Sequence, residues 1–309
     1  IKAKEHQSGY QMKAVMYGAG NIGRGFIAKR FYLSKMHTVF IDINTKLVEQ
    51  LNAAGRYPIY ETRGDGYVAE WVENALAING REAEAVAEAI ATADIMATSL
   101  GVNVLPHVAP LISSGIELRY RRGGKPLNIL ICENLIGAEA HLRGLVGRFI
   151  PEELKSYFEE QIGFVSASIC ITVPPTPETF LAENPLAVCT DAYRELPVDL
   201  DAFRPKGAEP PEIDGMVARS PFGFFIERKL LIHNMGHALM AYLGWQKKIN
   251  LIYDIACDGE IKYILTRALL ESARALAKKH GLPTDELVQF VEDLMVRFEN
   301  RLLVDDVFR

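Results

Sequence analysis

The chain has 309 residues, of which 49% are hydrophobic and 24% are charged, and its net charge is -5. This composition is that of a globular protein long enough for two domains with cores of their own. The negative charge argues against a nucleic-acid binder, which normally carries a basic face. The sequence contains no run of about 18 apolar residues, so it predicts no membrane span.

The cysteines and the N-terminus bear on location. Four cysteines lie far apart in the sequence: Cys132, Cys170, Cys189 and Cys257. They have neither CxxC spacing nor a histidine at metal-ligand distance, so we expect no metal ion. Without a signal-peptide core, the chain is expected in the cytoplasm. Residues 1–11 are polar and precede Met12, so we treat them as an extension outside the fold.

A glycine-rich turn follows the first predicted strand. Residues 13–17 form a short apolar run, the turn Gly18-Ala19-Gly20-Asn21-Ile22-Gly23 comes next, and residues 26–34 have helical composition. Residues 38–41 read as a second buried strand that ends at Asp42, about 20 residues after the last glycine. Strand, glycine turn, helix, strand and acid in this order predict an α/β, Rossmann-like doubly wound sheet that binds a dinucleotide.

Each glycine of the turn has its own physical reason. Gly18 permits a tight turn, Gly20 lets the backbone approach a pyrophosphate, and Gly23 lets the helix pack closely on the strand. The pyrophosphate is expected at the helix N-terminus, where the turn residues Asn21 and Ile22 lie and where free N–H groups favour an anion. The alternative is a structural glycine turn in an α/β protein that binds no nucleotide.

The next strand ends extend this site. Asp42 can bind the ribose hydroxyls and repel a 2'-phosphate, so the sequence favours NAD over NADP. Residues 57–71, around Gly64-Asp65-Gly66, predict an inserted hairpin, and residues 81–92 are helical in pattern. A strand at 94–99 follows, and Thr98 and Gly101 are expected to line the cofactor site because ligands bind at the carboxyl ends of parallel strands.

A further strand at 126–132 ends at Glu133-Asn134. Asn134 is therefore predicted where chemistry takes place. An asparagine that caps the following helix would look the same, so both interpretations of Asn134 stay open.

The second half of the chain changes character. Residues 164–173 predict one more strand, halted by prolines, and the stretch 197–215, rich in proline and glycine, predicts the passage between domains. We place a Rossmann-like domain at residues 12–200 and a mainly α-helical substrate domain at 201–309. Helical patterns there cover 227–244, 258–280 and 284–300, with Thr284 as the N-cap of the last.

The helical segment 227–244 carries an unusual polar set. At about 100° per residue, one side gathers four polar residues: Lys229, His233, Asn234 and His237. The other side gathers an apolar stripe, from which only Leu230 and Met240 are left out: Leu231, Ile232, Met235, Ala238, Leu239, Tyr242 and Leu243. A polar side usually faces water, but this one lacks the mixture of Glu and Lys that is typical of a solvated face.

These groups suit proton transfer at a carbon-bound oxygen. A lysine in a cleft can act as a base, because burial or a neighbouring cation lowers its pKa. The shift needed is from about 10.4 to roughly 7 to 8. An asparagine NH₂ group beside it can donate to an oxygen that gains negative charge.

Three stretches together resemble one family, the polyol-specific long-chain dehydrogenases. They are the glycine loop 18–26, the segment Cys132-Glu133-Asn134, and Lys229 followed by Asn234 and His237. The Lys-x4-Asn-x2-His pattern is the specific part, whereas many folds share the glycine loop. The glycine loop and Phe298-Glu299-Asn300 are most similar to the mannitol-phosphate branch.

The resemblance implies zinc-independent hydride transfer between NAD and a sugar-alcohol carbon, with mannitol 1-phosphate and its ketose phosphate as partners. It also implies roles: Lys229 as general base, Asn134 and Asn234 as donors to the oxyanion, and His237 as a group that orients the substrate. No nucleic-acid or membrane partner is implied. A related polyol or sugar-acid dehydrogenase and a catalytically silent dinucleotide-binding sensor remain as alternatives.

The chain departs from the family pattern at three places. Cys170-Ile171 stand where relatives usually have Asp-Arg, and His233 stands where they tend to be apolar. The family's C-terminal segment beyond Arg309, which contributes basic residues to the site, is missing from this sequence. Because of these departures, the sequence does not determine whether the substrate carries a phosphate.

Overall fold

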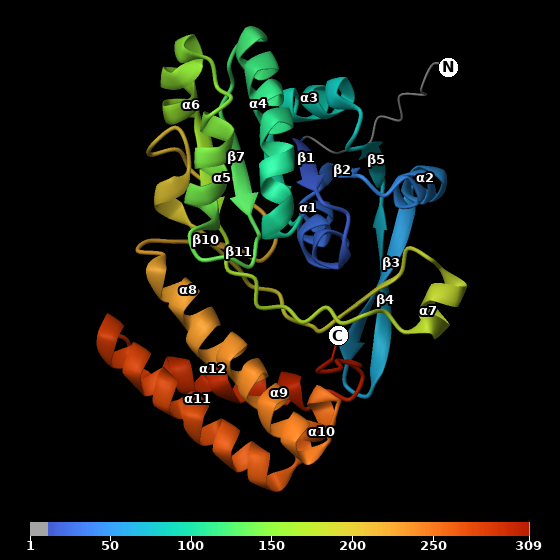
Figure 1. Ribbon diagram of the computed structural model, residues 1–309, viewed down its shortest axis with the longest axis vertical. Coiled ribbons are helices and arrows are strands. Elements are labelled where there is room, and N and C mark those ends of the chain that lie inside the picture. The colour runs from blue at the N-terminus through green and yellow to red at the C-terminus, as the bar shows by residue number, and fades with distance from the viewer. Residues whose placement is uncertain (1–11, 309) are drawn as a thin grey trace. The chain divides into compact units, whose positions relative to one another are not determined.

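The computed structural model describes residues 12–308, so the expected extension at residues 1–11 lies outside the described residues. The chain divides into two compact units, and each is described by itself (Figure 1). The first comprises the chain up to Tyr57, Trp71–Ala167 and Asp199–Ala218. The second comprises Pro58–Glu70, Ser168–Val198 and the chain from Arg219 onward.

The first unit is built on a six-stranded parallel sheet. Its strands, in spatial order, are β5 (Leu76–Asn79), β2 (Met36–Asp42), β1 (Met12–Tyr17), β6 (Ile95–Thr98), β7 (Leu127–Ile131) and β8 (Ile162–Ser166). The order reverses beside β1, which confirms the predicted doubly wound fold.

The strand register brings the predicted cofactor segments of this unit to one edge. Tyr17 is paired with Ile41 and with Thr98, and Thr98 is paired with Ile131. The residues that follow β1, β2, β6 and β7 therefore leave the sheet side by side. In a doubly wound sheet this edge forms the ligand crevice.

Helices cover the sheet and complete its core. They are the π-helix η1 (Gly23–Ile27), α1 (Ala28–Leu33), α2 (Thr45–Ala54), α3 (Ala83–Ala91), α4 (Leu105–Arg121), α5 (Ala138–Gly147) and α6 (Lys155–Gln161). Short 3-10 turns stand at Val102–Val104, Glu152–Leu154 and Leu200–Ala202. Apolar residues of α3, α4, α5 and α6 pack with those of β1, β6, β7 and β8 in one continuous core.

The second unit combines a small sheet with a helical bundle. Its sheet has the order β4 (Gly66–Glu73), β3 (Arg56–Arg63) and β9 (Val188–Thr190), so the predicted hairpin is present. The helices are α7 (Glu178–Glu183), α8 (Gly223–Arg228), the π-helix η5 (Lys229–Asn234), α9 (Met235–Lys247), α10 (Ile252–Cys257), α11 (Gly259–His280) and α12 (Thr284–Phe298). Strands β10 (Leu196–Asp199) and β11 (Met216–Arg219) lie where the chain passes between the units.

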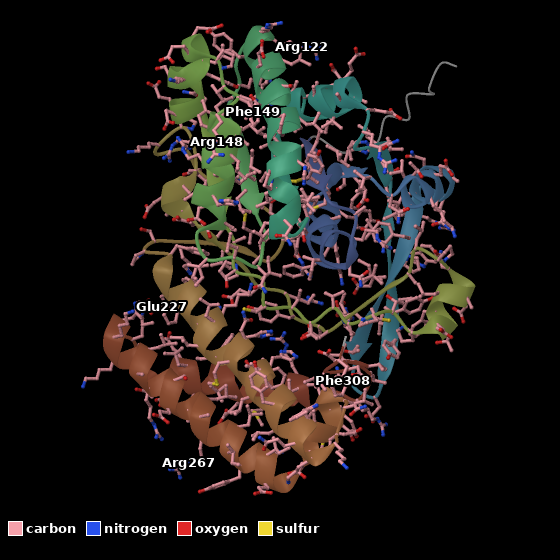
Figure 2. All side chains as sticks on the ribbon, in the orientation of Figure 1. Arg122, Arg148, Phe149, Glu227, Arg267 and Phe308 are labelled. Atoms are coloured by element: carbon pink, nitrogen blue, oxygen red, sulfur yellow. The ribbon has the colours of Figure 1, made fainter. Side chains whose placement is uncertain are left out.

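The bundle has a core of its own and an ionic tie. Buried side chains of η5 and of α9 to α12 form one cluster. Glu227 on α8, labelled in Figure 2, accepts a hydrogen bond from Lys279 at 2.6 Å and pairs with His280 at 2.8 Å. This contact joins α8 to the last turn of α11.

The predicted elements differ from the structure at two places. The strand expected at 164–173 ends at Ser166, because the chain leaves the sheet at Ser168, whose N–H donates to the Pro197 carbonyl. The buried apolar residues Cys170 and Ile171 made the run resemble a strand. The division into units is also less simple than one boundary at residue 200, because the hairpin and residues 168–198 group with the helices.

Candidate active site

The glycine turn of the first unit has the geometry that its three glycines predict. Gly18 has a φ of +103°, and a Cβ atom there would lie under 3.0 Å from the Ser99 carbonyl oxygen. A Cβ at Gly23 would lie under 3.0 Å from the Gly18 carbonyl oxygen. At Gly20 nothing lies within 4 Å, and Gly20 and Asn21 are exposed. Gly18 and Gly23 are thus required by packing, whereas Gly20 leaves open space for a ligand.

Asp42 connects the end of β2 to this turn. Its Oδ2 accepts from the Ala19 N–H at 2.8 Å, and its Oδ1 accepts from the Asn44 N–H at 2.9 Å. Each carboxylate oxygen can accept a further hydrogen bond. Asp42 therefore fixes the turn and still has acceptors for a pair of hydroxyl groups.

Arg24 is a residue of this turn that sequence reasoning missed. Its Nε donates to the Ala19 carbonyl at 2.7 Å, and the Tyr57 hydroxyl donates to the Arg24 carbonyl at 2.9 Å. Burial lowers the pKa of the Arg24 guanidinium, against the effects of Tyr57 and Asp42. Nothing in the local pattern distinguished this buried arginine from the exposed ones that begin many helices.

The turn after β6 is held by Glu133. The Leu100 N–H donates to Glu133 Oε1 and the Gly101 N–H to Oε2, both at 2.9 Å. Gly101 is exposed and has a φ of +88°. Thr98, in contrast, is fully buried, so its side chain is not available to a ligand in this structure. Glu133 therefore takes the positioning role at this edge, while Thr98 is a core residue.

Asn134 follows Glu133 and is exposed. Helix α5 has its N-cap at Gly137, which has a φ of +71°. Asn134 therefore does not occupy the N-cap, and the capping interpretation loses its basis. Its carboxamide stays at the carboxyl edge of the sheet.

In the second unit, the predicted catalytic segment begins with a π-helix. Lys229–Asn234 forms η5, between α8 and α9. In a π-helix each hydrogen bond spans one residue more than in an α-helix, and such turns are frequent at functional sites. Lys229 and Asn234 are partly exposed, whereas His233 is buried. Both predicted sites therefore contain a π segment, η1 after the glycine turn and η5 here.

The predicted apolar stripe of this segment is confirmed only in part: Ile232 is buried, and Met235, Leu239 and Leu243 pack against the core of the bundle. Tyr242 is 72% exposed and Leu231 is 48% exposed, while Met240, which the helical wheel left out, is fully buried. The extra residue of the π turn shifts every later position relative to a 100° wheel. Glycines mark the buried side: a Cβ at Gly236 would lie 3.1 Å from Leu269, and one at Gly244 would lie under 3.0 Å from Ile255.

Two histidines of the segment contact each other and a phenylalanine. The rings of His233 and His237 are 5.4 Å apart, and His237 meets the Phe298 ring edge-on at 4.9 Å. Burial, together with His237, Arg297 and Lys229, lowers the pKa of His233 well below its usual value. His233 is therefore a neutral core residue. His237 is partly exposed, and its Nε2 lies 3.2 Å from Asp305 Oδ2.

Cys170, one of the residues expected to depart from the family pattern, lies in the interior of the second unit. Its side chain is fully buried, and burial raises the pKa of the thiol against the opposing effects of Arg228 and Lys229. The Cys170 carbonyl accepts from Arg297. Arg297 also donates from Nε to Asp191 at 2.8 Å, and its guanidinium lies 4.6 Å from the Tyr193 ring centre.

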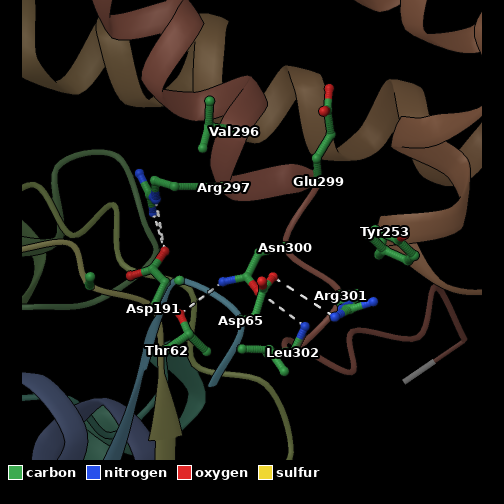
Figure 3. Close-up of a pocket in the computed structure, with 12 residues that line it drawn as sticks. Thr62, Asp65, Asp191, Tyr253, Val296, Arg297, Glu299, Asn300, Arg301 and Leu302 are labelled. Atoms are coloured by element: carbon green, nitrogen blue, oxygen red, sulfur yellow. Dashed lines mark hydrogen bonds and ion pairs between the residues drawn. The ribbon is translucent and has the colours of Figure 1, made fainter. Parts of the chain in front are cut away.

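A cavity of about 520 Å³ opens beside this arginine (Figure 3). It is bordered by the ion pair of Arg297 with Asp191 and by Asn300, which donates to Thr62 at 2.8 Å. Among the described lining residues, neither Lys229 nor Asn234 is present. The candidate catalytic residues therefore lie on the η5 segment and do not line this cavity.

The described residues include neither a cluster of metal-ligating side chains nor a membrane-spanning helix. In residues 12–308, no group of three or more His, Cys, Asp or Glu side chains is placed to hold a metal ion. No helix in that range combines the length and the apolar character needed to cross a membrane.

Comparison with known proteins now defines the class. The model of the mannitol dehydrogenase Rossmann domain matches residues 12–212, and that of the mannitol dehydrogenase C-terminal domain matches residues 223–309. The protein is thus a dehydrogenase with a dinucleotide-binding domain and a helical domain. The chain belongs to the mannitol dehydrogenase family, as a polyol dehydrogenase with a dinucleotide cofactor.

Two curated relatives are similar over almost the whole chain. Mannitol-1-phosphate 5-dehydrogenase of Geobacillus thermodenitrificans (strain NG80-2) is 37% identical over 96% of this chain and 76% of its own length. The protein of the same name from Brevibacillus brevis (strain 47 / JCM 6285 / NBRC 100599) is 37% identical over 96% of this chain and 75% of its own length.

Two solved structures share the fold. D-sorbitol dehydrogenase in substrate-free form superposes with a TM-score of 0.79 at 17% identity, over 96% of this chain and 71% of that one. Mannitol 2-dehydrogenase of Pseudomonas fluorescens, in ternary complex with NAD and D-mannitol, gives 0.75 at 15% identity, over 96% and 70%. At these identities the likeness shows the fold alone.

Proposed function

We propose that this protein interconverts mannitol 1-phosphate and fructose 6-phosphate by hydride transfer with NAD. The observation that carries the proposal is the η5 turn, which holds Lys229 and Asn234 and leads directly into His237. The names of the two curated relatives support the phosphorylated substrate. The identity of the cofactor rests on Asp42.

The first unit fits a dinucleotide. The open space at Gly20 and the exposure of Asn21, at the start of the helical segment, suit a pyrophosphate. Asp42 has acceptors for the two ribose hydroxyls, and its charge opposes a 2'-phosphate. NAD, when bound, supplies the nicotinamide that accepts the hydride.

The roles of the protein residues follow from the proton that the substrate hydroxyl loses and the negative charge that its oxygen gains. In alcohol oxidation, the proton of the reacting hydroxyl passes to the Nζ atom of Lys229 as the hydride leaves the carbon. The oxygen gains negative charge before it becomes a carbonyl, and the NH₂ groups of Asn234 and Asn134 donate to it. Loss of one such donor typically costs roughly 3 to 4 kcal/mol in the transition state. His237 orients a further part of the substrate.

The test is NADH consumption by the purified chain with fructose 6-phosphate and with unphosphorylated fructose. We expect reduction of the phosphorylated sugar only, and much slower turnover with NADPH. If both sugars react equally, the phosphate assignment is wrong. If neither reacts although NADH binds, the named activity is wrong while the fold is unaffected.

A second candidate is a dehydrogenase for another polyol or a sugar acid. Cys170 favours this second candidate. The residue is buried, and the polar group that it could offer to a substrate, its carbonyl, already accepts a hydrogen bond from Arg297. The same assay with unphosphorylated ketoses and uronates distinguishes the two candidates. Faster turnover with any of these than with fructose 6-phosphate favours the second.

A further inference from the structure

His237 is held by a buried carboxylate from the end of the described chain. Its Nε2 lies 3.2 Å from Asp305 Oδ2, and the Asp305 side chain is only 5% exposed. A carboxylate that contacts one ring nitrogen determines which nitrogen carries the proton. Asp305 is therefore a candidate for controlling the tautomer of His237.

Asp305 itself is fixed by the backbone around it. The Ile252 N–H donates to the Asp305 carbonyl, and the Val307 N–H donates to the Asn250 carbonyl, both at 2.9 Å. Leu251 and Asp306 form an antiparallel bridge between these two bonds. The segment that carries Asp305 is thus paired with the start of α10 as a short strand would be. Its carboxylate has a defined position and is not a mobile surface group.

The imidazole ring of His237 is also fixed from the side. The Phe298 ring meets it edge-on, with an angle of 76° between the ring planes. Among the described residues, none forms a hydrogen bond to His237 Nδ1. Two contacts therefore orient the ring, one with Asp305 at Nε2 and one with the Phe298 ring. Nδ1 can then form a hydrogen bond with another molecule.

We infer that Asp305 is a positioning residue that keeps the proton of neutral His237 on Nε2, so that Nδ1 accepts a hydrogen bond from a substrate hydroxyl. The inference rests on the proposed function and deepens it. A carboxylate can only accept, so the Nε2–H donates to Asp305 and Nδ1 keeps its lone pair. An acceptor at this point selects an alcohol and disfavours a carboxylate or phosphate oxygen, which has no proton to donate. The substrate group that contacts His237 is therefore a free hydroxyl.

The first test reads the tautomer directly by ¹⁵N NMR of histidine-labelled protein in alkaline buffer, where imidazole is neutral. A His237→Gln sample identifies the two ring signals. We expect the proton on Nε2 in the unaltered protein, so this measurement needs no variant that has to fold. A proton on Nδ1 overturns the inference.

The second test uses Asp305→Asn, whose NH₂ group can donate to Nε2 and move the proton to Nδ1. The same change of the triad aspartate in a serine protease favours the wrong histidine tautomer. Asp306→Asn is the matched control, because it removes the same charge one residue further on. We expect the proton to move in Asp305→Asn and to stay in Asp306→Asn. No movement in Asp305→Asn contradicts the inference.

Kinetics supply the functional readout. Loss of such a supporting partner typically lowers affinity or activity by about 10- to 100-fold at metal-bound histidines. We expect a fall of similar size in kcat/KM for Asp305→Asn, mostly through KM, because a hydroxyl bound equally in ground and transition states affects KM. If the tautomer responds but no polyol is turned over, the proposed function is wrong and the positioning stands. If turnover is present and both tautomer and KM are unchanged, the positioning role is wrong.

Discussion

His233 shows at the scale of one residue how position decides chemistry. The sequence placed it in a polar set beside Lys229, yet its side chain is buried and its Nδ1 lacks a hydrogen-bond partner among the described residues. Burial and the cations around it keep the folded-state pKa well below that of a free histidine. Burial of an unpaired polar nitrogen is unfavourable, so His233 destabilises the fold.

We predict that this histidine makes the protein acid-sensitive. The unfolded chain takes up a proton near pH 6.5, whereas folded His233 stays neutral, so the free energy of unfolding decreases as pH falls below about 6.5. The free energy of unfolding decreases by at most about 1.4 kcal/mol for each pH unit. Urea unfolding between about pH 7.5 and 5 measures it, and His233→Leu should show a smaller decrease. An identical pH dependence in both proteins contradicts this account.

The glycine turn gives a second prediction for single residues. Gly20→Ala places a methyl group in open space, so the protein should fold normally but bind NADH about tenfold more weakly, a difference of about 1.4 kcal/mol. Gly23→Ala forces a methyl group onto the Gly18 carbonyl and should cost roughly 1–3 kcal/mol of folding stability. Urea unfolding and NADH fluorescence titration separate the two effects. Normal NADH binding by Gly20→Ala would show that Gly20 is only a turn residue.

At the scale of elements, regular patterns were predictable and irregular ones were not. β1, β2, β6 and β7 were found because buried parallel strands are short apolar runs. The π turn η5 was missed, since its residues have the same composition as an α-helix. Packing through Gly236 and Gly244 was missed as well, because a hydrophobic pattern gives weight to large side chains. Thr284 begins α12 as its first residue, one position after the N-cap at Pro283.

The packing of α9 through its glycines can be tested with a pair of variants. Gly244→Ala should destabilise the protein by roughly 1–3 kcal/mol, because the new methyl group overlaps the Ile255 side chain. Gly259→Ala is the matched control: it lies in α11 of the same unit, and nothing lies within 4 Å of its Cβ position. Its stability should be unchanged or slightly higher. Equal stability of both variants in urea contradicts the close approach.

For the whole molecule, the two units have separate cores, and the residues predicted to hold the cofactor all belong to the first. The sequence predicted two domains with the glycine turn in one and Lys229 in the other. It could not predict that the hairpin Pro58–Glu70 joins the second unit, because pairing between distant segments such as β3 and β9 leaves no local pattern.

The central claim is that Lys229 is the general base of an NAD-dependent polyol-phosphate dehydrogenase. The most direct measurement compares Lys229→Ala with the unaltered protein in a stopped-flow assay of mannitol 1-phosphate oxidation, beside NADH titrations of both. A positioned base typically contributes about 10²- to 10⁴-fold to the rate. The account predicts a loss of that size in turnover with unchanged NADH affinity. Normal turnover by Lys229→Ala would contradict it.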